Sequence, residues 1–373
     1  MKIAFISTYY NHHQSFISQK LYELTDGDYR FIETSSISQE RKALGYQQNC
    51  APFVLQYKGQ ESYEAIEWVN TADIVIAGVA PAALLAQRKK DKKIIFKYSE
   101  HILKKGFQFW KYPYRRYKMH KDNPSDVPMY MLCASAYTAS DYAKFGLFKG
   151  KCYRWGYFPE CKRYENFDAV LSSKSFREIL WCGRFLDWKH PDDVLMLAEK
   201  LRSQGYDFHI NIIGTGEMEE QLHNIHREKQ LGDCVSFLGS MPPEKVREYM
   251  EKSGIYLFTS DHKEGWGAVL NEAMNSGCAV VASAEAGSTK YLIKDSDNGF
   301  IYSSKNFDLL YEKVKYLLDH SSEQKRLGHN AYNSIIDEWN PDVAVQRLLK
   351  LFEAVLEGKE NPDLFEKGPL SRA

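Results

Sequence analysis

The sequence contains no apolar run long enough to span a bilayer anywhere in its 373 residues. The apolar run near the start, residues 3–6, is too short for a signal peptide and predicts a buried strand. Seven cysteines are scattered along the chain and form no Cys-x-x-Cys pair and no Cys/His ligand cluster. We therefore expect a cytoplasmic protein with reduced thiols and no metal site.

Net charge is also absent, because 49 basic side chains balance 49 acidic ones. No internal repeat and no low-complexity stretch is present. The length predicts two domains of ordinary size. Short apolar runs alternate with helical patterns, which predicts an α/β fold with parallel sheets.

The most informative stretch is residues 255–283, which predicts a strand, a glycine-rich turn, a helix and a second strand. A helix that begins after Gly267 presents free N–H groups and a partial positive charge, which suits a pyrophosphate. Glu264 before the helix and Glu272 within it offer carboxylate acceptors for sugar and ribose hydroxyls. The alternative is an ordinary strand–helix–strand unit with two solvated glutamates.

Three more motifs precede this stretch in a fixed order. They are Leu180-Trp-Cys-Gly-Arg-Phe185 with Lys189, Ile212-Ile-Gly-Thr-Gly216, and Val235-Ser-Phe-Leu-Gly239. Together with Glu264 and Glu272 they cover roughly residues 178–303. This half of the chain resembles retaining glycosyltransferases of the GT-B fold, in the large GT4-like group that carries a Glu-x7-Glu motif.

The resemblance implies two Rossmann-like, doubly wound domains that face a central cleft. We expect an acceptor-binding domain over residues 1–158 and a nucleotide-sugar-binding domain over residues 159–339. A last helix at about residues 340–358 is expected to return to the first domain. Residues 359–373 are polar and include two prolines, which predicts a flexible tail.

The resemblance also implies roles for individual residues. Arg184 and Lys189 are expected to clamp the leaving diphosphate, since guanidinium and ammonium groups bind phosphate oxygens. Glu264 is expected to hold the transferred sugar and Glu272 the ribose, with no metal required. The expected donor-binding positions are Gly183, Arg184, Lys189, Gly214, Gly216, Leu238, Met241, Glu264, Gly265, Trp266, Gly267, Ala268 and Glu272.

The N-terminal half offers polar residues where strands are predicted to end, which is where ligands sit in doubly wound sheets. Asn11, His12 and His13 follow the first strand, and Glu100 and His101 follow a later one. We take these residues as acceptor-side candidates and His101 as a further catalytic candidate. Solvated loop residues are the alternative.

Residues 88–121 carry thirteen basic side chains against Asp91 and Glu100, interleaved with aromatic side chains that include Phe107, Phe109, Trp110, Tyr112, Tyr114 and Tyr117. Such a mixture suits an anionic membrane surface, where aromatic rings sit at headgroup depth. Nucleic acid is a competing partner, but no nucleic-acid motif accompanies the patch and none is expected. A solvated supporting face is the third interpretation.

The chain is thus expected to be a retaining, metal-independent, hexosyltransferase-type enzyme that needs no cofactor. It would move a sugar from a nucleotide-sugar, expected to be UDP-linked, to a glycan or lipid-linked acceptor in polysaccharide biosynthesis. One alternative is a catalytically silent GT-B subunit that binds a partner or a membrane. Another is a different GT-B enzyme, such as a nucleotide-sugar epimerase.

Overall fold

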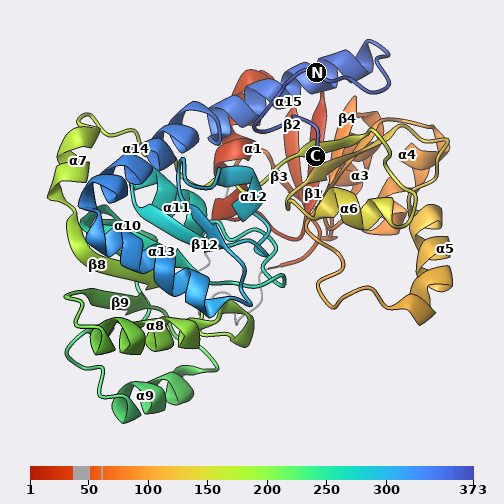
Figure 1. Cartoon of the computed structure of the whole chain (residues 1–373). Helices are drawn as coiled ribbons and strands as arrows, with labels where there is room; N and C mark the ends of the chain where they lie inside the picture. The colour runs from red at the N-terminus through yellow and green to blue at the C-terminus, as the bar shows by residue number, and fades with distance from the viewer. Residues whose placement is uncertain (37–50, 60–61) are drawn as a thin grey trace. The chain divides into compact units, whose positions relative to one another are not determined.

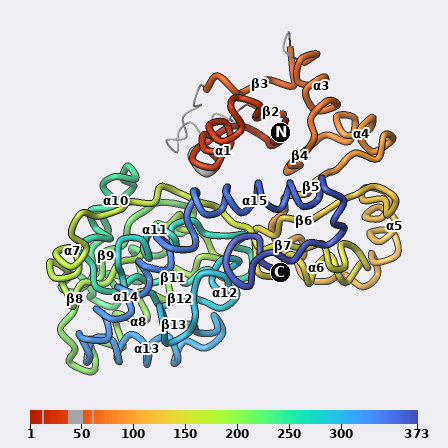
Figure 2. Tube along the Cα trace, turned by 90° about the horizontal axis from the view of Figure 1, so that it is seen from above, coloured from red at the N-terminus to blue at the C-terminus, as the bar shows by residue number. Residues whose placement is uncertain are grey.

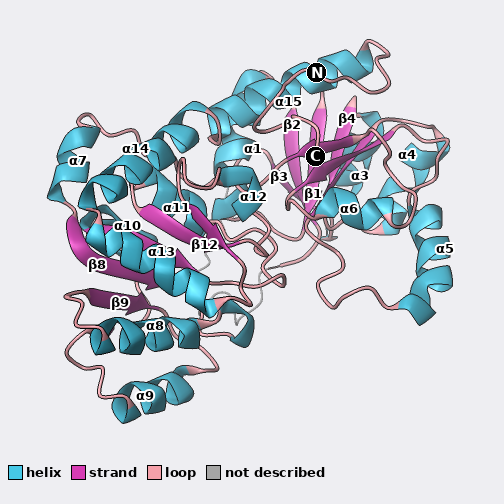
Figure 3. Cartoon of the chain, in the orientation of Figure 1, coloured by secondary structure: helices cyan, strands magenta, loops and turns pink. Residues whose placement is uncertain are grey.

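A computed structural model describes residues 1–36, 51–59 and 62–373. The chain divides into two compact units. Unit 1 comprises Met1–Pro159 and Asn340–Ala373, and unit 2 comprises Glu160–Trp339. Each unit is a parallel sheet flanked by helices (Figures 1 and 3), so the predicted α/β class with two Rossmann-like domains is confirmed.

The sheet of unit 1 has seven strands in the order β3-β2-β1-β4-β5-β6-β7. All pairings are parallel, and Ile3 of β1 lies opposite both Tyr29 of β2 and Ile74 of β4. Burial on both faces explains the nearly continuous apolar sequence of the central strands. The strands are β1 Ile3–Ser7, β2 Tyr29–Glu33, β3 Val54–Gln56, β4 Ile74–Ala77, β5 Ile95–Ser99, β6 Met129–Cys133 and β7 Cys152–Arg154.

The helices of unit 1 include one contributed by the far end of the chain. Helix α15 runs alongside the strands of unit 1 (Figure 2). Its apolar face packs onto the unit, and its Phe352 ring lies 4.7 Å from Phe96 of β5. Lys20 of α1 pairs with Asp342 at 2.9 Å, so the predicted return of the last helix is confirmed. Among the described residues, the helices of unit 1 are α1 His12–Leu24, α3 Ser62–Thr71, η2 Ala82–Leu85, α4 Ala86–Lys90, η3 Phe109–Lys111, α5 Tyr112–Asp122, α6 Thr138–Ala143 and α15 Pro341–Leu356.

The structure corrects the expected flexible tail. Leu370 and Ser371 are buried, and their backbone pairs with Arg154 of β7 through two 2.8 Å hydrogen bonds. Tyr153 also donates its hydroxyl to the carbonyl of Pro362 at 2.9 Å. An edge strand presents unpaired backbone groups, and the tail satisfies them at the edge of β7. Its polar composition gave no sign of this pairing.

The sheet of unit 2 has six parallel strands in the order β10-β9-β8-β11-β12-β13. The strands are β8 Ser175–Cys182, β9 His209–Ile213, β10 Val235–Phe237, β11 Ser253–Phe258, β12 Ala279–Ser283 and β13 Phe300–Tyr302. The helices are α7 Phe167–Ser173, η4 Asp187–Lys189, α8 Pro191–Ser203, α9 Glu219–Glu228, α10 Pro243–Lys252, α11 Val269–Asn275, α12 Thr289–Leu292, α13 Phe307–Asp319 and α14 Ser321–Asp337.

Strand order reverses between β8 and β11, which makes this pair the topological switch point of unit 2. In open parallel sheets, ligands bind outside the carboxyl ends of strands at such a point. The loops after β8 and β11 therefore carry the candidate site. Among the residues that the structure describes, no helix is long and apolar enough to cross a bilayer.

Candidate active site

Two loops meet at the switch point of unit 2. Because β8 and β11 are parallel neighbours, their following loops leave from the same edge. The backbone N–H of Asp261 donates to the carbonyl of Trp188 at 2.9 Å. Thr259 accepts from Trp181 Nε1 at 2.8 Å and donates to the carbonyl of Lys189 at 2.5 Å. These bonds hold the two loops side by side.

The held loops bring Lys189 and Glu264 into direct contact. Lys189 Nζ lies 2.5 Å from Glu264 Oε2, and the two side chains are only 13% and 11% exposed. Ser260 donates its hydroxyl to the same carboxylate oxygen at 3.2 Å. The Trp188 ring lies 4.8 Å from the ammonium. Both charged residues were predicted site residues, but no sequence pattern indicated that they pair.

Arg184 differs from Lys189 in its surroundings. Its side chain is exposed, and it forms no ion pair within the described part of the chain. Arg184 lies on the same loop as Lys189, after β8, and an exposed guanidinium without an acidic partner can receive an anion without first losing one.

The glycines of the neighbouring loop are required by backbone contact. Gly214 has a φ of +140°, and a Cβ there would lie 1.9 Å from the carbonyl oxygen of Gly183. Gly216 has a φ of +157°, and its Cβ would lie 2.7 Å from the carbonyl oxygen of Phe185. The loops after β8 and β9 thus touch through their main chains, and Phe185 donates to the carbonyl of Thr215 at 2.9 Å.

Glu272 lies on α11, next to the end of β8. Burial raises the pKa of its carboxyl group, Arg247 of α10 lowers it, and Glu160 raises it. Burial and the charge of Glu272 also raise the pKa of Cys182 to about 12, against the opposing charge of Lys189. Glu272 and Lys189 therefore both act on the last residue of β8. Within the described residues, the Glu272 carboxylate has no hydrogen-bond partner.

The remaining donor-side candidates divide between loop and interior. Gly267 has a φ of +85°, and a Cβ there would lie 2.3 Å from the Phe258 ring. Trp266 is 1% exposed and donates Nε1 to Asn271 Oδ1 at 2.9 Å. Its side chain therefore belongs to the packing of unit 2, and only its backbone can meet a ligand. Gly265 is buried and Ala268 is half-buried.

Two of the expected donor-binding side chains are partly exposed. Leu238 and Met241 flank the end of β10 and are both half-buried. Thr215 and Ser240 bring the loops after β9 and β10 together, with their hydroxyl oxygens 3.0 Å apart.

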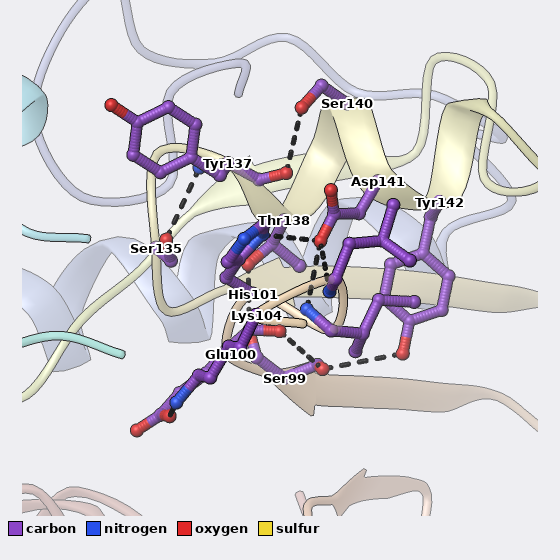
Figure 4. Close-up of polar contacts among 12 residues, drawn as sticks. Ser99, Glu100, His101, Lys104, Ser135, Tyr137, Thr138, Ser140, Asp141 and Tyr142 are labelled. Atoms are coloured by element: carbon purple, nitrogen blue, oxygen red, sulfur yellow. Dashed lines mark hydrogen bonds and ion pairs between the residues drawn. The ribbon is translucent and has the colours of Figure 1, made fainter. Parts of the chain in front are cut away.

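In unit 1, His101 pairs with a residue that the sequence did not indicate. Its Nδ1 lies 2.5 Å from Oδ2 of Asp141, which is buried in α6 (Figure 4). The same oxygen accepts from the backbone N–H groups of Ile102 and Leu103, at 2.9 and 3.0 Å. Asp141 thus fixes both the imidazole and the loop. Its separation of forty positions from His101 left no local pattern to find.

Glu100, the neighbouring candidate, does not pair with His101. Glu100 contacts Lys104 Nζ at 2.7 Å and the hydroxyl of Tyr157. In Figure 4, the Glu100 and Lys104 side chains extend together away from Asp141.

The remaining acceptor-side candidates lie at the start of α1. Asn11 is buried, and its carbonyl accepts from the backbone of Gln14 and Ser15 at 3.0 Å. The side chains of His12 and His13 lie outside the described part of the structure. Among the described residues, no group of three or more His, Cys, Asp or Glu could hold a metal ion.

Residues 162–334 match the family described as "Glycosyl transferases group 1". An uncharacterised glycosyltransferase of Haemophilus influenzae is 30% identical over 179 residues, which are 46% of this chain and 49% of that protein. The capsular polysaccharide biosynthesis glycosyltransferase CapM of Staphylococcus aureus is 21% identical over 191 residues, 48% of this chain and 47% of that protein. The match thus spans about half the length of these curated relatives.

Solved structures resemble the chain over nearly its whole length. Anabaena HepE in complex with UDP has a TM-score of 0.71 at 13% identity, covering 95% of this chain and 100% of that one. The same protein has also been solved with UDP-glucose, with a TM-score of 0.67. At this identity the likeness establishes the shared fold.

Proposed function

The chain belongs to the group 1 glycosyltransferase family and has the GT-B fold, and from this premise we propose a reaction. The protein moves a sugar from a UDP-sugar to a glycan or lipid-linked acceptor, with retention of configuration at the anomeric carbon. The observation that carries the proposal is the Lys189–Glu264 pair at the switch point of unit 2, and the exposed Arg184 lies on the loop that also carries Lys189. The choice of UDP is supported by the UDP-bound structures of HepE.

The leaving diphosphate is the group that gains negative charge during transfer. Arg184 supplies a forked donor and Lys189 a point charge, and Glu264 holds Lys189 in place before the reaction. Preorganised charges of this kind stabilise the transition state because no solvent has to reorient around them. Lys189 is already held by Glu264, so a diphosphate would share the ammonium with the carboxylate.

Glu264 and Glu272 act as hydrogen-bond acceptors. Glu264 accepts from hydroxyls of the transferred sugar through the carboxylate oxygen that Lys189 leaves free. Glu272 has no partner of its own among the described residues, and it accepts from the ribose hydroxyls. In its charged form a carboxylate offers acceptors only, which suits a vicinal diol.

Bond exchange needs no dedicated protein base. The acceptor hydroxyl attacks the anomeric carbon on the face that the diphosphate leaves. A phosphate oxygen takes the hydroxyl proton as the carbon–oxygen bond to the diphosphate breaks. In unit 1, His101, whose ring contacts Asp141, is proposed as a further catalytic candidate.

The test is a thermal-shift titration with UDP, GDP and ADP on the wild type and on Glu272→Ala. A ligand that binds only the folded state at a hundred times its Kd stabilises by about 2.7 kcal/mol. We expect UDP to raise the midpoint of the wild type and to have little effect on Glu272→Ala. Glu244→Ala, at an exposed glutamate of α10, should respond as the wild type does.

Absence of a shift with any nucleotide would contradict the proposed donor site and favour a catalytically silent subunit. A thermal shift with GDP or ADP alone would support the donor site but contradict uracil as the nucleobase. A panel of UDP-sugars, followed by UDP release, would then identify the sugar.

A further inference from the structure

The basic segment 88–121 has two parts in the structure. The structural half, from Arg88 to Lys104, holds basic side chains that contact unit 1, and the exposed half faces solvent. In the structural half, Arg88 is buried and donates to the backbone carbonyls of Val69, Ala72, Asp73 and Ile94. Burial lowers its pKa to about 10.

Other cations in the structural half also have partners. Lys89 and Lys93 donate to main-chain carbonyls at 2.8 and 2.6 Å. Lys92 and Lys104 form ion pairs with acidic residues at 3.1 and 2.7 Å. These four side chains make contacts within unit 1. The prediction of one basic surface over all of residues 88–121 is therefore wrong for this part of the segment.

The exposed half is η3 and α5, residues 109–122. Phe109 and Trp110 of η3 are 79% and 76% exposed, and Tyr114 and Tyr117 of α5 are 70% and 68% exposed. Soluble proteins leave single apolar side chains exposed, but a contiguous set marks an interaction site. Four large aromatic side chains within nine residues form such a set.

The geometry of α5 puts its two exposed tyrosine rings on one face with cations. Tyr114, Tyr117, Lys118 and Lys121 follow the i, i+3, i+4, i+7 spacing of a single helix face. The opposite face is anchored: Tyr112 donates to the carbonyl of Lys144 at 3.1 Å, and its ring lies 5.7 Å from Phe145. Helix α5 lies at the edge of its unit beside α6 (Figures 1 and 2).

The charge of this segment has one sign. Residues 105–121 contain six Lys and Arg side chains and no Asp or Glu. Among the residues that the structure describes, Arg115 and Arg116 contact only neutral groups, Gln108 at 3.4 Å and the Tyr112 hydroxyl at 3.1 Å. Cations without acidic partners complement an anionic surface.

We propose that the outward face of η3 and α5 binds an anionic lipid bilayer, with Phe109, Trp110, Tyr114 and Tyr117 entering the headgroup region. Tyrosine and tryptophan have an apolar ring and a polar tip, and they settle at the membrane interface for that reason. Lys118 and Lys121 contact lipid phosphates while their aliphatic stems lie along the rings. A partner that bound through charge alone would not contact the four exposed rings, one of which, Phe109, has no polar atom. The inference goes beyond the proposed function and does not depend on it.

Co-sedimentation of the full chain with vesicles tests this interface. Phosphatidylcholine vesicles with phosphatidylglycerol are compared with vesicles of phosphatidylcholine alone. We expect binding to the anionic vesicles only, weakened by salt. Each basic side chain near such a surface contributes about fivefold, so Lys118→Gln with Lys121→Gln should lower partitioning on the order of 30-fold.

Aromatic variants and matched controls complete the experiment. Trp110→Ser with Tyr114→Ser removes apolar contact and should lower partitioning about tenfold or more. Tyr63→Ser should change nothing, since Tyr63 is equally exposed, at 76%, on α3 of the same unit. Lys58→Gln with Lys149→Gln, at two exposed lysines of unit 1, should also leave partitioning unchanged.

The proposal is overturned if the η3 and α5 variants bind anionic vesicles as strongly as the wild type does. It is also overturned if the control variants lose as much vesicle binding as the η3 and α5 variants. It is also overturned if the chain binds dextran sulfate but not anionic vesicles, which would indicate a polyanionic polymer as partner. UDP-dependent thermal shifts, measured on the same variants, should not change. Failure of lipid binding is thereby kept separate from failure of the donor site.

Discussion

The contact between Lys189 and Glu264 makes a quantitative prediction about stability. The pair is 2.5 Å long and about nine-tenths buried on both sides. Exposed pairs contribute about 0–1 kcal/mol, whereas breaking a fully buried pair costs about 3–5 kcal/mol. Hydrogen bonds to charged groups contribute about 1.5–3 kcal/mol, so we expect a coupling free energy of about 2 kcal/mol for this partly buried pair.

The perturbation is a double-mutant cycle of Lys189→Met, Glu264→Gln and the double variant, followed by scanning calorimetry. Each single variant leaves one charged group without its partner, and its midpoint should fall by roughly 4–8 °C for about 2 kcal/mol. The double variant should lose much less than the sum of the singles, because neither orphaned charge remains.

A surface pair of the same unit is the control. Lys200 and Asp308 also approach to 2.7 Å, but their side chains are 37% and 82% exposed. The cycle of Lys200→Met and Asp308→Asn should give a coupling of about 0.2–1 kcal/mol. A coupling for Lys189 and Glu264 no larger than this would refute the inference from burial.

The same variants separate binding from transfer. Glu264→Gln frees the Lys189 ammonium, so UDP should bind at least as tightly as to the wild type, whereas Lys189→Met should weaken UDP binding. Transfer should nevertheless fall in Glu264→Gln, because the sugar loses a charged acceptor. Isothermal titration with UDP and turnover measured as UDP release test these two effects independently. Wild-type turnover in Glu264→Gln would contradict the role of this residue.

Three further predictions follow from the same unit. Arg184→Ala should weaken UDP binding about tenfold or more in a titration while leaving the unfolding midpoint unchanged. Arg177→Ala, at an exposed arginine within β8, should change neither. Gly214→Ala should prevent folding of unit 2 or lower its unfolding midpoint severely, because the added Cβ would lie 1.9 Å from a carbonyl oxygen. Gly205 is the control, since it has open space around it but a φ of +77°. Gly205→Ala should cost about 1 kcal/mol in the same thermal-unfolding measurement. Burial raises the pKa of Asp193 to about 6. Between about pH 4 and 6 this carboxyl group therefore binds more protons in the folded state than in the unfolded state. The free energy of unfolding should fall as pH rises through that range. Asp193→Asn should remove about 1–2 kcal/mol of that fall, after allowance for solvent screening, and identical pH profiles of the two proteins would contradict the prediction.

Local pattern was enough for the elements and for part of the site. The apolar run at residues 3–6 forms β1, and the Gly-x-Gly after β9 is required because its main chain touches the loop after β8. The last helix returns to unit 1, as the resemblance predicted. Such features can be found from sequence because backbone conformation, burial pattern and glycine requirements depend on neighbouring residues.

Tertiary structure alone decided which side chains meet. Lys189 contacts Glu264, and His101 contacts Asp141, because parallel strands bring distant loops to one edge. The polar tail is ordered because β7 offers it an unpaired edge. In the segment 88–121, Arg88 is buried whereas Trp110 is exposed, although both belong to the same basic and aromatic pattern. Composition determines which groups are present, but only packing determines which of them are free to meet a partner.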